Sequence, residues 1–130
     1  MNNQKISEQI IGLQQACFLY AKEIIQSKQT LIPFGAYLDS NGEIIVEDSL
    51  SSEFKANRIE ALSQKLKTLS FSQGKNIWVV CFDAFMDEDT AEPKEAVCLE
   101  VYNAQKSVLY LYYPYLWHEN SLTFLKPFSE

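Results

Sequence analysis

Apolar side chains recur at alternating four- and three-residue steps through the first quarter of the chain. They are Ile6, Ile10, Leu13, Cys17, Tyr20 and Ile24. This spacing predicts one face of an amphipathic helix over about Ser7–Lys28. A second row beside it, formed by Ile11, Phe18 and Ile25, widens the apolar face. We therefore expect this helix to lie deep against a sheet.

After Pro33 the apolar period drops to two. Phe34–Asp39 and Glu43–Asp48 are predicted strands, joined by a tight turn at Asn41-Gly42, where positive φ is favoured. Ser51 or Ser52 can then cap a second helix. Its predicted buried stripe is Phe54, Ile59, Leu62, Leu66 and Leu69, and Gly74 follows as a helix breaker.

The remainder of the chain is predicted to be β structure. Asn76–Met86 carries apolar residues at both parities, which is typical of a central strand covered on both faces. Further strands are predicted at Glu95–Asn103, Ser107–Tyr113 and Leu122–Leu125. Pro114 cannot donate to a β ladder, so we expect the strand before it to end there or to lie at an edge.

These elements predict an α+β fold. The order is helix, hairpin, helix and antiparallel meander, with the two helices packed on one face of a mainly antiparallel sheet of five to six strands. The length of 130 residues suits a single domain spanning residues 1–130.

Charge and composition narrow the function classes. The formal net charge is -6, and Arg58 is the only arginine, so neither nucleic acid nor an anionic membrane surface is an expected partner. Apolar runs fall short of a membrane span, and the N-terminus lacks the apolar region of a secretory signal. Three cysteines without a close pair favour reduced thiols in the cytoplasm.

Candidate catalytic groups are few. His118 is the only histidine, and a small enzyme would have to combine it with Cys98, or use carboxylates such as Glu100. Cysteines within strands usually behave as small apolar residues. The spacing of Cys17, Cys81 and Cys98 does not suit a zinc site, and glycine-rich phosphate motifs are absent from the sequence. We expect no cofactor, no metal and no catalytic role.

The acidic segment from Asp83 to Glu100 contains seven carboxylates and one lysine, so its charge equals the net charge of the whole chain. A solvated loop is the simplest interpretation. A cation site at Asp87 and Asp89 lacks the residue order of an EF-hand, and a glycosidase-like acid pair among these carboxylates is a further alternative. The remaining alternative is an edge that binds a basic protein by electrostatic steering.

The run from Val108 to His118 contains five aromatic rings. In a strand, Val108, Tyr110 and Tyr112 would point to one face, and Leu109, Leu111 and Tyr113 to the other. Such residues can serve structure alone through cross-strand pairs. Tyrosine and tryptophan are also enriched at interfaces, which makes Tyr112, Tyr113, Tyr115 and Trp117 candidate anchors for a partner.

A small, acidic, cytosolic α+β domain without evident catalytic residues resembles the immunity proteins of bacterial toxin systems. The resemblance implies a non-enzymatic protein that neutralises a basic toxin, for instance a nuclease, by binding it directly. The expected partner-binding residues are Asp83, Asp87, Glu88, Asp89, Glu92, Glu95, Tyr112, Tyr113, Tyr115 and Trp117. Two alternatives remain open: a structural subunit that forms a homo-oligomer through its sheet, and the small enzyme considered above.

Overall fold

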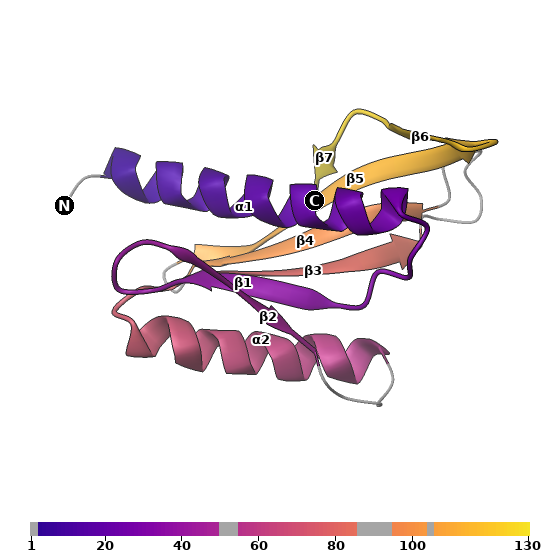
Figure 1. Cartoon of the computed structure of the whole chain (residues 1–130). Coiled ribbons are helices and arrows are strands. Elements are labelled where there is room, and N and C mark those ends of the chain that lie inside the picture. The colour runs from indigo at the N-terminus through magenta and orange to yellow at the C-terminus, as the bar shows by residue number, and fades with distance from the viewer. Residues whose placement is uncertain (1–2, 50–54, 86–94, 104–105) are drawn as a thin grey trace.

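The computed structural model describes residues 3–49, 55–85, 95–103 and 106–130. Two helices and the strands of one sheet follow the predicted order along the chain, which is helix, hairpin, helix and antiparallel strands (Figure 1). The elements are α1 (Asn3–Gln26), β1 (Phe34–Leu38), β2 (Ile44–Asp48), α2 (Lys55–Ser72), β3 (Ile77–Phe85), β4 (Glu95–Asn103), β5 (Lys106–His118), β6 (Ser121–Phe124) and β7 (Phe128–Ser129). The α+β class is confirmed.

In the described part of the chain the sheet has seven strands, in the order β2-β1-β3-β4-β5-β6, with the short β7 paired to β5. Each pair is antiparallel. The hairpin β1–β2 turns at Gly42, whose φ of 82° is the positive value expected there. The predicted meander from β3 to β6 is confirmed, with β7 as an additional two-residue strand.

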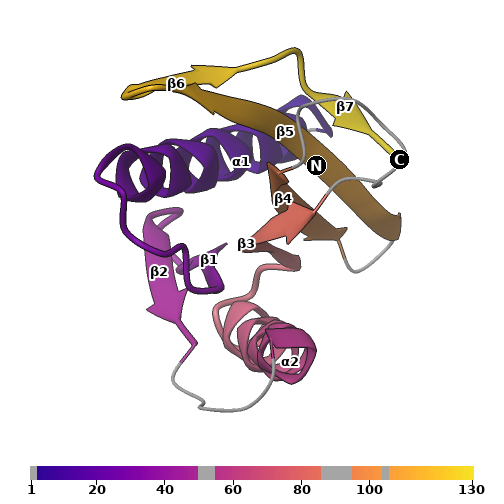
Figure 2. The ribbon, with the colours of Figure 1, turned by 90° about the vertical axis from the view of Figure 1, so that its right-hand side faces the viewer.

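The two helices lie on opposite faces of the sheet, so the prediction that they share one face is wrong (Figure 2). β3 explains the arrangement. Its Val79 and Cys81 pack in the core cluster of α1, whereas Trp78 and Val80 pack with Leu66 of α2. Apolar residues of both parities need cover on both faces, and one helix supplies each cover.

The helix α1 lies in the concave face of a sheet that curls around it (Figure 2). Leu13, Cys17 and Ala21 are fully or almost fully buried along its inner face. At one side the Tyr20 ring lies 4.6 Å from the ring of Phe34 in β1. At the other side Phe18 stacks on Tyr113 of β5, with 4.3 Å between ring centroids. The predicted deep packing of this helix is confirmed.

The helix α2 covers β1 and β3 on the convex face. Leu62 and Leu66 from its predicted stripe are buried, while the predicted caps Ser51 and Ser52 lie outside the described residues, as does Phe54. The close approach of α2 to the sheet depends on Gly35 in β1. A Cβ added there would lie 2.6 Å from the Val79 carbonyl oxygen and even closer to the Leu66 side chain.

The strand β5 continues through Pro114 to His118 and lies between β4 and β6, so the expectation that the strand ends at Pro114 or lies at an edge is wrong. Pro114 pairs with Ala96 of β4, and its carbonyl accepts a hydrogen bond from the Leu125 N–H at 2.8 Å. The amide and carbonyl of one residue in an antiparallel strand point to the same side. The side of β5 on which Pro114 lacks an N–H therefore faces away from β4. Pro114 lies between the residues of β5 that pair with β6 and those that pair with β7.

Candidate binding pocket at the end of α1

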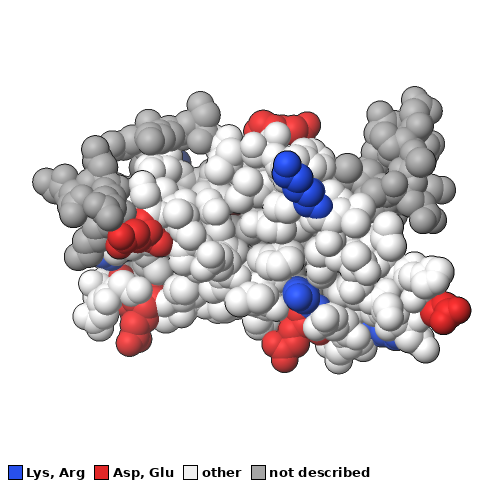
Figure 3. All heavy atoms as spheres, turned by 90° about the horizontal axis from the view of Figure 1, so that it is seen from above, with Lys and Arg blue, Asp and Glu red and all other residues white. Residues whose placement is uncertain are grey.

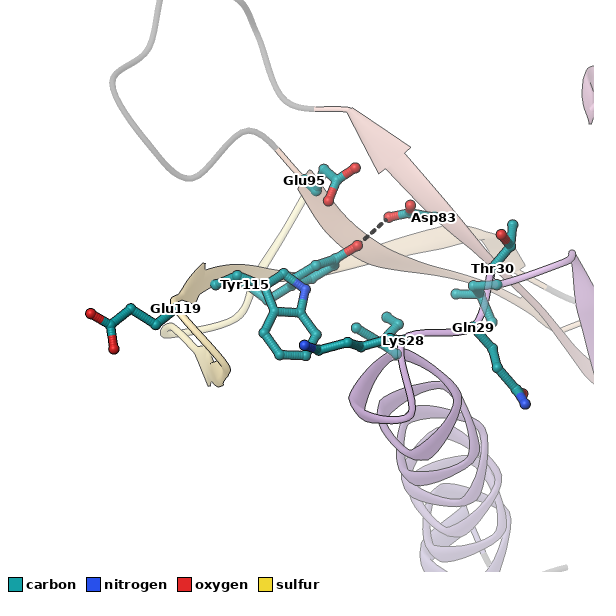
Figure 4. Close-up of a pocket in the computed structure, with 10 residues that line it drawn as sticks. Lys28, Gln29, Thr30, Asp83, Glu95, Tyr115 and Glu119 are labelled. Atoms are coloured by element: carbon teal, nitrogen blue, oxygen red, sulfur yellow. Dashed lines mark hydrogen bonds between the residues drawn. The ribbon is translucent and has the colours of Figure 1, made fainter.

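A pocket of about 450 Å³ lies where α1 ends against the sheet (Figure 4). Its walls come from the end of α1, the segment that leads to β1, and the neighbouring parts of β3, β4 and β5. The lining residues are Ile25, Lys28, Gln29, Thr30, Leu31, Asp83, Glu95, Tyr115, Trp117 and Glu119. Its volume falls within the range of small-ligand pockets.

Two carboxylates and a tyrosine form one wall of the pocket. Tyr115 is only 4% exposed, and its hydroxyl donates a hydrogen bond to Asp83 Oδ1 at 3.0 Å. Glu95 lies directly opposite Tyr115 in the β4–β5 register, so it projects to the same face. Figure 4 shows the carboxyl groups of Asp83 and Glu95 together at the hydroxyl end of the Tyr115 ring.

Burial, followed by the negative charge of Asp83, raises the pKa of Tyr115 well above its ordinary value, and Glu95 acts in the same direction. The tyrosine therefore remains a hydrogen-bond donor at neutral pH. By donating to Asp83, the Tyr115 hydroxyl holds that carboxylate in place. Asp83 and Glu95 provide the hydrogen-bond acceptors of this wall. This wall can receive hydrogen-bond donors and positive charge.

Lys28 from the end of α1 and Trp117 from β5 line another part of the pocket. Lys28 Nζ lies 5.6 Å from the centre of the Trp117 ring, within the range of a cation–π contact. The same ammonium group donates a hydrogen bond to Asn120 Oδ1 at 2.7 Å. The half-buried indole of Trp117 therefore already has a positive charge beside it.

Two backbone positions beside the pocket adopt conformations that usually belong to glycine. Lys28 has φ 63° at the end of α1, where the N–H groups of Lys28 and Gln29 bond to the carbonyls of Ile25 and Ile24 in a Schellman motif. Glu119 has φ 57° in the two-residue turn between β5 and β6. Such strain clusters at functional sites, and here both residues line the pocket.

The structure brings together four of the predicted partner-binding residues: Asp83, Glu95, Tyr115 and Trp117. Tyr113 shares their face of β5 but stacks on Phe18. Tyr112 points to the other face, where its ring stacks on Phe128 and its hydroxyl donates to Glu130 Oε1 at 3.0 Å. The remaining four, Asp87, Glu88, Asp89 and Glu92, lie outside the described residues.

The candidate catalytic groups are not brought together. Cys98 pairs with Tyr112, and His118 lies six residues farther along β5, a separation of about 20 Å in an extended strand. Glu100 accepts a hydrogen bond from the Tyr102 hydroxyl at 2.7 Å on the face opposite the pocket. Burial raises the pKa of the Cys17 thiol to about 12 and that of Cys81 well above its ordinary value, which disfavours thiolate chemistry.

Within the described ranges, no three His, Cys, Asp or Glu residues are grouped so that they could hold a metal ion. The helices in these ranges also include none that is long and apolar enough to cross a bilayer. Seen from above the view of Figure 1, the described surface is mostly uncharged, with a few acidic and basic groups scattered over it (Figure 3). Exposed apolar residues on α1 itself include Leu19, which is 60% exposed.

Lys28, Gln29 and Thr30 are pocket residues that the sequence did not reveal. The apolar periodicity placed Lys28 inside the helix, and the usual signal of a helix end, a glycine, is missing from S-K-Q-T. Glu119 is a further pocket residue that no sequence motif singled out. Its neighbours His118 and Ser121 pair across the hairpin, which fixes its place at the pocket.

Comparison with known proteins found no matching family model, curated protein or solved structure.

Proposed function

We propose that this protein is a non-enzymatic binding protein that neutralises a basic protein, in the manner of the immunity proteins that it resembles. The observation that carries the proposal is the convergence of Asp83, Glu95, Tyr115 and Trp117 on one pocket from three strands. Carboxylates provide charge complementarity and steering. Aromatic side chains provide contact area at the same place.

The charged groups of the pocket favour a cationic partner. Asp83 and Glu95 line the pocket from β3 and β4, and Figure 4 shows Glu119 directed away from them. In sequence, the segment between β3 and β4 adds Asp87, Glu88, Asp89 and Glu92 next to the strand ends that carry the pocket. A basic protein approaching this end of the sheet would be attracted before contact.

The experiment is capture of partners from an extract of the native cell on the immobilised protein, at about 50 mM and about 500 mM salt. We expect a basic protein to bind at low salt and to be released at high salt. The purified partner should then lose its own activity when an equimolar amount of this protein is added. A partner that is captured but keeps full activity would contradict neutralisation.

A matched pair of variants locates the contact. The double variant Asp83→Asn, Glu95→Gln removes the charges of the pocket while preserving oxygen acceptors. Glu43→Gln removes a charge from the β1–β2 turn at the opposite end of the sheet. We expect partner capture to be lost with the double variant and kept with Glu43→Gln.

A second candidate function is assembly through a sheet edge. β2 is an edge strand, and its Ile44 and Val46 are 40% and 41% exposed. Exposed apolar edge strands can pair with another chain. Sizing at rising protein concentration tests this function: an oligomer that dissociates in Val46→Lys would support it, and a monomer at all concentrations would exclude it.

A further inference from the structure

The residues that line the pocket indicate the chemistry of the group that it can bind. One wall holds the carboxylates of Asp83 and Glu95, and the Tyr115 hydroxyl is already engaged as a donor to Asp83. Its other wall is the Trp117 indole, with the buried Ile25 and Leu31 nearby. A group that fits both walls must be positively charged, rich in N–H donors and flat enough to lie on an aromatic ring.

Lys28 shows that the tryptophan wall accepts a cation. Its ammonium group lies 5.6 Å from the ring centre and is tied to Asn120. The lysine comes from a backbone position with φ 63°, where glycine would be less strained. The residue that places a cation beside Trp117 thus also carries a conformational penalty.

A guanidinium group suits this pocket better than an ammonium group. Guanidinium is planar, stacks on aromatic rings and donates two parallel hydrogen bonds to a carboxylate. An ammonium group is compact and strongly hydrated, so it makes less use of the indole. The volume of about 450 Å³ exceeds what one guanidinium requires and leaves space for its aliphatic stem.

We propose that the pocket binds one arginine side chain of the partner, with its guanidinium between the carboxylates of Asp83 and Glu95 and the ring of Trp117. This inference rests on the proposed function and names the group by which the basic partner is held. The arginine would enter beside Lys28, whose charge repels it and whose contact with Trp117 it would replace.

The test uses two short peptides, acetyl-Gly-Arg-Gly-amide and its citrulline counterpart. Citrulline has nearly the same shape as arginine but is neutral. Binding is followed through the indole N–H signals in nuclear magnetic resonance spectra, with Trp78 on the opposite side of the sheet as the internal control. We expect the arginine peptide to shift the Trp117 signal saturably and the citrulline peptide to bind at least about ten-fold more weakly.

Two variants should change the affinity in opposite directions. Asp83→Asn with Glu95→Gln should weaken binding of the arginine peptide at least about ten-fold, and an unchanged Trp78 signal would show that the fold is kept. Lys28→Gln should tighten binding several-fold, because the variant no longer places a positive charge beside Trp117 that competes with the arginine. Equal binding of both peptides, indifference to the double variant, or unchanged or weaker binding by Lys28→Gln would each overturn the proposal.

The result separates the inference from the proposed function. If the arginine peptide does not bind while capture of a basic partner still depends on Asp83 and Glu95, the arginine site is wrong and the binding function stands. If the peptide binds as expected and low salt yields no basic partner, the arginine site stands and the neutralising function is wrong.

Discussion

The hydroxyl of Tyr115 donates a hydrogen bond at 3.0 Å to Asp83, which lies on β3, two strands away in the sheet. The bond spans the intervening β4, which contributes Glu95 to the same cluster. A buried tyrosine thus fixes one carboxylate beside another, at the end of the sheet where α1 stops. The candidate pocket is built around this relationship.

Replacing Tyr115 by phenylalanine tests the contribution of the hydroxyl and its interactions with Asp83 and Glu95. The ring and its packing remain, while the Asp83 carboxylate loses its tyrosine donor. We expect the free energy of unfolding to fall by about 1–2 kcal/mol, measured by urea denaturation. Tyr20→Phe, at an exposed tyrosine whose ring alone contacts Phe34, is the control and should change stability by less than about 0.5 kcal/mol. Equal effects of the two changes would contradict the role given to the Tyr115 hydroxyl.

Stability should fall at alkaline pH. Burial raises the pKa of Tyr102 to about 12, and burial with neighbouring Asp83 raises that of Tyr115 further. A folded-state pKa above the unfolded value of about 10 leaves stability unchanged below that pH and lowers it above, because the unfolded chain releases the proton first. Urea denaturation at about pH 9 and about pH 11 should show this loss. Tyr115→Phe should show a smaller loss; an equal loss in both proteins would contradict the assignment.

Lys28 should carry a measurable conformational penalty. Its φ of 63° lies in the left-handed region, which a residue with a Cβ occupies at a disadvantage. We expect Lys28→Gly to be more stable than Lys28→Ala by about 1 kcal/mol, since both variants lose the contacts with Asn120 and Trp117 equally. Thermal and urea unfolding of the two variants measure the difference. An alanine variant as stable as the glycine variant would refute the penalty.

Gly35 and Gly12 should respond oppositely to alanine. A Cβ at Gly35 would collide with the Val79 carbonyl and the Leu66 side chain, whereas a Cβ at Gly12 would meet nothing within 4 Å. We expect Gly35→Ala to destabilise the protein by about 1–3 kcal/mol. Gly12→Ala, inside α1, should stabilise it by about 0.5–1 kcal/mol. Equilibrium unfolding checks both, and a neutral Gly35→Ala would contradict the close packing of α2.

Much of the fold could be predicted because burial imposes a period on the sequence. Leu13 and Cys17 mark the inner face of α1, and the turn at Gly42 fixes the first hairpin. The double-sided apolar pattern of β3 also predicted a central strand covered on both faces. Periodicity does not say which face each helix covers, and so the assignment of both helices to one face failed.

The pocket was harder to predict than the fold. Asp83, Glu95, Tyr115 and Trp117 were visible as candidates, but their meeting depends on the β4–β5 register, which places Glu95 opposite Tyr115. That register continues past Pro114, a residue that locally favours a strand end. Lys28 lines the pocket at a left-handed helix end, although the residue there is not glycine. Tertiary contacts, and not local propensity, therefore determine its position.

Association kinetics with the captured basic partner test the central claim most directly. The association rate constant is measured against salt for the wild type, for Asp83→Asn with Glu95→Gln, and for Glu43→Gln. We predict that the double variant lowers the association rate, flattens its salt dependence and weakens affinity at least about ten-fold, while Glu43→Gln behaves like the wild type. Unchanged rate and affinity in the double variant would contradict a partner-binding role for this pocket.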